Sequence, residues 1–120
     1  MNKERRKHTR YEIENAVSVD SEGVFQIVDI SKGGFRFKCP PNTSISDNWI
    51  ADIINSVIPL ERVPVRKIWV SIYENERFNQ PFLVIVGAKF GKLNKEHKQK
   101  LIKLLDNKSL RQILKSNLHI

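Results

Sequence analysis

The sequence predicts an all-β domain with one or two α-helices at its C-terminal end, and three observations lead to this fold class. Short segments rich in β-branched and aromatic residues alternate with turn residues over the first 90 positions. Several of these segments alternate apolar and polar residues, which is typical of a strand with one buried face. After residue 94 the apolar spacing changes to that of a helix.

Six strands are expected, at residues 16–19, 24–30, 35–38, 49–57, 63–73 and 82–90. Residues 20–23 and 31–34 are predicted turns, and the latter contains two glycines where positive φ would be tolerated. Residues 74–81 form a polar connection. Short strands separated by turns favour a β-sandwich or a small closed barrel.

The last quarter of the chain is expected to be helical. Asn94 can cap a helix over about residues 95–106, and Asn107 can end it. Ser109 can cap a second helical segment within residues 107–120. The apolar residues that would form one face of these helices are Leu101, Ile102, Leu104 and Leu105 in the first and Leu110, Ile113, Leu114 and Leu118 in the second.

The composition is that of a single globular domain. The chain has 120 residues, 40% of them hydrophobic and 28% charged, and no run approaches the roughly 20 apolar residues of a membrane span. The basic N-terminus lacks the apolar segment of a secretory signal. Cys39 is the only cysteine, which excludes an internal disulfide and a multi-cysteine zinc site. We therefore expect a cytoplasmic protein.

The charge distribution indicates an anionic partner. The net charge is +8 and the pI is about 9.8. Lysine and arginine are concentrated in the first ten residues and in the last third of the chain, whereas the middle is nearly balanced. Such a balance favours nucleotides, nucleic acid, membrane surfaces or acidic protein faces as partners.

Two short motifs in the first third of the chain suggest which anion this is. Arg6 and Arg10 form an Arg-x-x-x-Arg motif that Arg5 directly precedes, and residues 29–34 form an Asp-x-Ser-x-x-Gly motif. Together they resemble the signature of the PilZ domain, a family of bacterial receptors for cyclic di-GMP. Residues 86–90 are also similar to the Gly-x-x-Phe end of the last barrel strand in that family.

The resemblance covers about residues 5–106 and implies a six-stranded antiparallel PilZ-type β-barrel with a helix beside it. We expect three segments: a flexible basic arm at 1–10 that carries RxxxR, the barrel with its helix at 11–106, and, outside the resemblance, a helical extension at 107–120. Ligand binding would order the arm against the barrel and change the surface offered to an unknown downstream protein.

The residue types of the two motifs suit a cyclic dinucleotide. An arginine can bond bidentately to guanine or phosphate and can stack on a base, and a carboxylate can accept from guanine N1 and N2. The resemblance implies that Arg6, Arg10, Asp29, Ser31 and Gly34 bind the ligand. We add Arg5, the guanidinium directly before the motif, and Gly33, the second glycine of the turn, as further ligand-binding residues. Because Arg5 adds a third guanidinium, we expect two molecules of cyclic di-GMP per protomer.

No motif of a known catalytic site is present, so we expect a binding protein without enzymatic activity, metal or cofactor. The three histidines have no metal-ligand spacing. Trp49 and Trp69 are assigned to the core, Cys39 is expected to be a small core or edge residue, and His8 is expected to be exposed.

Two alternatives remain open at the level of sequence. A basic β-barrel could bind nucleic acid through its lysine-rich tail, with Phe35 and Phe37 as stacking platforms. A PilZ-like barrel could also serve only as a protein-interaction module. A dinucleotide receptor should prefer the guanine over the adenine cyclic dinucleotide, whereas a nonspecific basic barrel should bind oligonucleotides and weaken steeply with salt.

Overall fold

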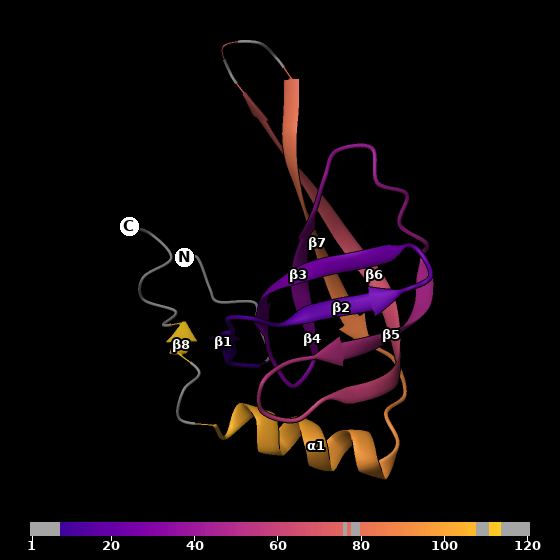
Figure 1. Ribbon diagram of the computed structural model, residues 1–120, viewed down its shortest axis with the longest axis vertical. Coiled ribbons are helices and arrows are strands. Elements are labelled where there is room, and N and C mark those ends of the chain that lie inside the picture. Colours follow the sequence, from indigo (N-terminus) through magenta and orange to yellow (C-terminus); the bar gives the residue numbers. More distant parts are fainter. Residues whose placement is uncertain (1–7, 76, 78–79, 108–110, 114–120) are drawn as a thin grey trace, which may run out of the picture.

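The computed structural model describes residues 8–75, 77, 80–107 and 111–113 and contains one large antiparallel sheet and one helix (Figure 1). The elements are β1 (Arg10–Glu12), β2 (Val17–Asp20), β3 (Gly23–Ile30), β4 (Gly34–Cys39), β5 (Asn48–Ile54), β6 (Leu60–Asn75), β7 (Gln80–Phe90), α1 (Lys95–Leu105) and β8 (Arg111–Ile113). The six predicted strands correspond to β2 to β7, and the predicted helix at 95–106 corresponds to α1.

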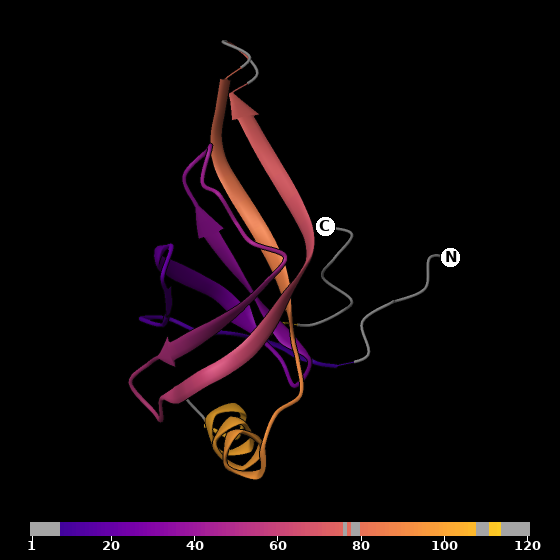
Figure 2. The same cartoon turned by 90° about the vertical axis from the view of Figure 1, so that its right-hand side faces the viewer.

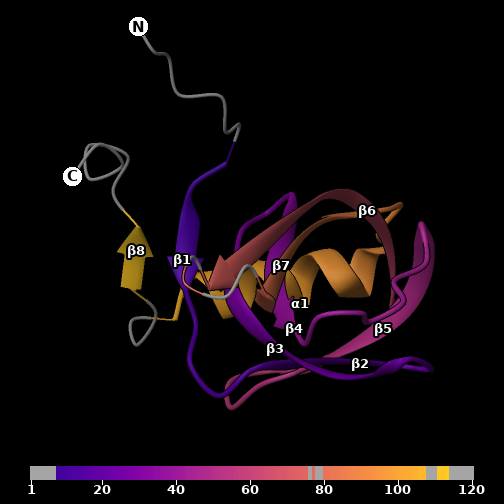
Figure 3. The ribbon, with the colours of Figure 1, turned by 90° about the horizontal axis from the view of Figure 1, so that it is seen from above.

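Strands β2 to β7 close into a barrel. Their order around the barrel is β2-β5-β6-β7-β4-β3. Strand β3 also pairs with β2, and this pairing closes the ring of six strands. Every pairing is antiparallel. Seen from above, the strands form a ring with α1 beneath it (Figure 3). The predicted six-stranded antiparallel barrel with a C-terminal helix is confirmed.

Aromatic and branched side chains fill the barrel. Along β4, Phe35 and Phe37 are almost fully buried, whereas Arg36 between them faces outward, as strand alternation requires. Phe37 contacts the rings of Phe25 and Trp49. Cys39 is also buried, as predicted. Because Phe35 and Phe37 are 3% and 1% exposed, they cannot act as the stacking platforms of a nucleic-acid-binding barrel.

Helix α1 begins at its predicted cap and packs against the barrel. The Asn94 side chain accepts a hydrogen bond from the His97 backbone N–H, and the His97 ring accepts one from the Asn94 backbone N–H. The helix buries Leu101, Leu104 and Leu105. No helix in the described part of the chain is long and apolar enough to span a membrane.

Strands β6 and β7 are longer than predicted. Residues of the expected 74–81 connection belong to the two strands, which pair as far as Asn75 and Gln80. The resulting hairpin projects well beyond the barrel, on the side opposite α1 (Figures 1 and 2).

Two short strands lie outside the predicted set. Strand β1 pairs with the end of β3, and β8 pairs with the other edge of β1. Residues 111–113 are therefore a strand, and the helix predicted for this part of the 107–120 extension is wrong there. Arg10, assigned to the flexible arm, lies in β1. Residues 1–7, 108–110 and 114–120 lie outside the described residues.

Candidate functional site

A cavity of about 300 Å³ lies on the outer face of the barrel, between β1, the β3–β4 turn and strands β4, β6 and β7. Five of the seven ligand-binding residues expected from the sequence line it: Arg10, Asp29, Ser31, Gly33 and Gly34. The other two, Arg5 and Arg6, lie outside the described residues. The fold thus brings residues from both sequence motifs to one site.

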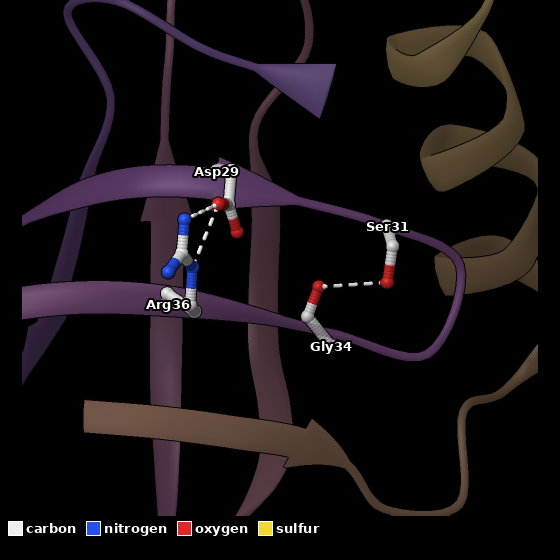
Figure 4. A network of polar contacts seen from close by, with 4 residues as sticks. All are labelled: Asp29, Ser31, Gly34 and Arg36. Carbon is white, nitrogen blue, oxygen red and sulfur yellow. Dashed lines mark hydrogen bonds and ion pairs between the residues drawn. The ribbon is translucent and has the colours of Figure 1, made fainter. Parts of the chain in front are cut away.

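Asp29 forms the polar centre of this site together with Arg36. The two residues are opposite each other on β3 and β4. Nε of Arg36 donates to Oδ2 of Asp29 at 2.7 Å, and Nη2 of Arg36 donates to the same oxygen (Figure 4). The Asp29 side chain is 2% exposed and the Arg36 side chain 29% exposed. A buried carboxylate therefore holds a guanidinium that remains accessible from the cavity.

Ser31 stabilises the β3–β4 turn. Its hydroxyl accepts a hydrogen bond from the Gly33 N–H at 3.1 Å, and its backbone N–H donates to the Gly34 carbonyl at 2.8 Å. The same hydroxyl lies 3.4 Å from the Gly34 carbonyl oxygen (Figure 4). These bonds are those of a local side chain–backbone turn and fix the rim of the cavity.

Gly34 is required by a close approach of two strands. A Cβ atom added there would lie 2.0 Å from the carbonyl oxygen of Ala88 on β7. Positive φ was expected to explain the two glycines of this turn, but among the described glycines only Gly23 has a positive φ. A Cβ at Gly33 would instead meet the ring of His8 at 2.8 Å. His8 is exposed, as predicted, and also lines the cavity.

Trp69 lies in the cavity and not in the core. A Cβ at Gly87 would fall 2.2 Å from its Cε2 atom, so the indole lies over this glycine, and the residue is 38% exposed. Simple alternation from the buried Val65 would turn Trp69 inward. The β6–β7 register shifts between Lys67 and Trp69, and this bulge turns the side chain to the outer face.

Basic side chains surround the cavity. Arg10, Arg36 and Lys89 line it, and Asp29 is the only acidic residue among the described residues that do so. Arg36, Trp69 and Lys89 were not predicted from the sequence as residues of the site. Strand alternation predicts that Arg36 and Lys89 face outward, because each lies between two buried residues. Arg36 is also close in sequence to the Asp-x-Ser-x-x-Gly motif, and Lys89 is close to the end of β7. The described residues contain no group of three or more potential metal ligands.

A closed six-stranded barrel with a C-terminal helix and this polar turn on its outer face has the fold of a PilZ domain. Two solved structures show the similarity. The chain matches the MrkH–c-di-GMP complex of K. pneumonia with a TM-score of 0.67 and 16% identity, over 85% of this chain and 50% of that one. It matches the PilZ domain of YcgR from Escherichia coli, solved with c-di-GMP, with a TM-score of 0.62 and 12% identity, over 84% and 88%.

These comparisons establish the fold. The chain spans half the length of the MrkH chain that it matches. No family model matches the sequence, and no curated protein matches it.

Proposed function

We propose that this protein is a cyclic di-GMP receptor, a binding module without enzymatic activity that acts in the cytoplasm. The observation that carries the proposal is the cavity that collects the described residues of both sequence motifs beside an accessible arginine and an indole ring. The two structurally similar proteins, MrkH and YcgR, were solved with c-di-GMP.

In this proposal the basic side chains hold the phosphates and guanine edges. Arg10, Arg36 and Lys89 supply donors that suit phosphate oxygens, and a guanidinium also matches guanine O6 and N7. Trp69 offers an exposed ring on which a base can stack. Gly34 lies in the wall of the cavity, where the close approach of β7 leaves no room for a side chain.

Asp29 was expected to accept from guanine N1 and N2. Its burial and its two bonds from Arg36 favour a different role, in which it positions Arg36 for the ligand. Ser31 keeps the turn in shape. We propose Arg5 and Arg6 as further ligand-binding residues on the strength of the motif alone.

We further propose that two cyclic di-GMP molecules bind per protomer at saturation. One molecule has only two bases, and its outer faces can stack on a second copy. The cavity is small, at about 300 Å³, so much of a stacked pair would be covered by the basic arm. Ordering of that arm would change the surface presented to a downstream protein.

Isothermal titration calorimetry with cyclic di-GMP and cyclic di-AMP tests the proposal. We expect binding of the guanine dinucleotide with a stoichiometry of two and a clear preference over the adenine one. Arg10→Ala should weaken binding by roughly tenfold to a hundredfold, because it removes a charge-assisted contact worth on the order of 1.5–3 kcal/mol. Absence of binding would refute the receptor function, and a one-to-one endpoint would refute the paired ligand.

A further inference from the structure

One edge of the projecting hairpin carries a run of apolar residues without a neighbouring strand. The pairing of β5 with β6 ends at Asn48 and Arg66, and the next residue, Lys67, donates its backbone N–H to Asp47. Beyond this point, among the described residues, β6 pairs only with β7. We call residues 68–73 the β6 edge. Figure 2 shows β6 as the outer strand of the hairpin.

The β6 edge has an exposed apolar surface on both faces. Trp69 and Tyr73 lie on one face, with Ser71 between them, and are 38% and 47% exposed. Val70 and Ile72 lie on the other face and are 46% and 60% exposed. The segment contains no charged residue and no proline. Natural edge strands are usually protected by such residues, so an edge without them is suited to pairing with another strand.

We propose that the β6 edge pairs antiparallel with the same edge of a second copy of this chain, about a two-fold axis at Ser71. This register places Trp69 of each copy opposite Tyr73 of the other on one face. On the opposite face it places Val70 opposite Ile72. Cross-strand aromatic and aliphatic pairs of this kind stabilise antiparallel sheets. All four exposed apolar side chains acquire an apolar partner.

Self-complementarity favours a second copy as the occupant. A two-fold interface requires one patch to match itself, and the order aromatic–aliphatic–serine–aliphatic–aromatic over residues 69–73 is symmetric about Ser71. A charged partner strand would find no opposite charge in this segment. Pairing would also convert the exposed two-stranded hairpin into a four-stranded sheet, and an isolated two-stranded hairpin is only marginally stable.

The pairing would connect the two ligand cavities. Trp69 lines the cavity in each copy, and the proposed register puts Tyr73 of the partner subunit beside it. The second copy would thus contribute one aromatic side chain to the wall of the site.

Sedimentation equilibrium of the full chain without nucleotide tests the association, so that the result is independent of ligand binding. We expect a concentration-dependent dimer. Ile72→Lys should weaken dimerisation by about tenfold or more, because it places two buried charges in the interface. Val24→Lys is the matched control, since Val24 is 64% exposed and lies on β3, away from this edge. A monomer at all concentrations, or equal effects of the two substitutions, would overturn the proposal.

Disulfide cross-linking tests the register. In Ser71→Cys the two introduced thiols would face each other at the axis, where opposite Cα atoms are about 4.5–5.5 Å apart, within disulfide range. Burial raises the pKa of the Cys39 thiol, so this native cysteine should not compete. We expect a covalent dimer from Ser71→Cys and none from Ser21→Cys, which lies in the exposed β2–β3 turn. Cross-linking of both variants to the same extent would contradict the register.

Discussion

Asp29 and Arg36 form an ion pair, and their different burial suggests a different role for each residue. The carboxylate lines the cavity but is only 2% exposed, whereas the guanidinium is 29% exposed, so we expect Asp29 to act on the proposed ligand through Arg36. Removing Asp29 would leave Arg36 without its anchor, and a charged side chain without a fixed position loses much of its contribution to binding.

A double-mutant cycle on cyclic di-GMP affinity distinguishes positioning from direct contact. We expect Asp29→Ala and Arg36→Ala each to weaken binding by roughly tenfold to a hundredfold, and the double variant to be little worse than either. Arg66→Ala, an exposed arginine on β6 that does not line this cavity, is the control and should bind nearly normally. Additive losses, together with lost discrimination against cyclic di-AMP in Asp29→Ala, would show that the carboxylate reads the guanine itself.

Gly34 and Gly33 provide a second contrast at the residue scale. Gly34→Ala forces a methyl group to within 2.0 Å of a backbone carbonyl on β7, and the strands have to separate. We expect a loss of about 3 kcal/mol or more in the free energy of unfolding, measured in urea. Gly33→Ala meets only the exposed His8 ring, which can move, and should cost less than about 1 kcal/mol. Similar costs at both positions would contradict this explanation of Gly34.

At the scale of elements, a buried histidine holds the N-terminal end of α1. His97 is 8% exposed. Its Nδ1 accepts from the Asn94 N–H at 3.3 Å, and its Nε2 lies 2.7 Å from the Glu61 carbonyl oxygen, to which it donates in this tautomer. One side chain therefore closes the N-terminus of the helix and attaches it to β6.

His97→Ala should consequently loosen the helix without opening the barrel. Two part-buried backbone groups, the Asn94 N–H and the Glu61 carbonyl, lose their partner, which predicts a loss of about 2 kcal/mol in the free energy of unfolding. Hydrogen exchange should accelerate in 95–105 more than in β4. Lys98→Ala, at the adjacent exposed position, should have almost no effect. Uniform acceleration across the barrel would instead show that helix and barrel unfold together.

The elements also show where prediction from sequence succeeds and where it fails. Long strands and α1 were found because their apolar periodicity is continuous, and Asn94 was recognised by its capping chemistry. The orientation of Trp69 was missed, because the inserted residue Ile68 reverses the alternation and the sequence does not mark the bulge. Strands β1 and β8 have three residues each, too few for a period, and pair only through long-range contacts.

The candidate site could be predicted only in part. The two motifs identified residues that the fold brings together, although nothing in their spacing shows that Arg10 on β1 and Ser31 after β3 share a cavity. Strand alternation places Arg36 on the outer face, but its pairing with Asp29 could not be predicted, because the register of β3 and β4 is set by the whole barrel.

At the scale of the whole molecule, barrel closure and the outer strands are separable. The barrel closes through the β2–β3 pairing, whereas β8 lies at the end of the sheet and pairs only with β1 among the described strands. Two truncations test what β8 contributes. A chain that ends at residue 113 keeps β8, and a chain that ends at residue 107 lacks it.

Both truncated chains should fold, because neither cut removes a strand of the barrel. We expect their melting temperatures to differ by less than about 5 °C, which corresponds to roughly 1 kcal/mol in a domain of this size. The chain ending at residue 107 should bind cyclic di-GMP several-fold more weakly, since Arg10 lies on β1, which then pairs with β3 alone. Equal affinity of the two chains would show that β1 needs no support from β8. Failure of only the shorter chain to fold would show that β8 belongs to the cooperative core.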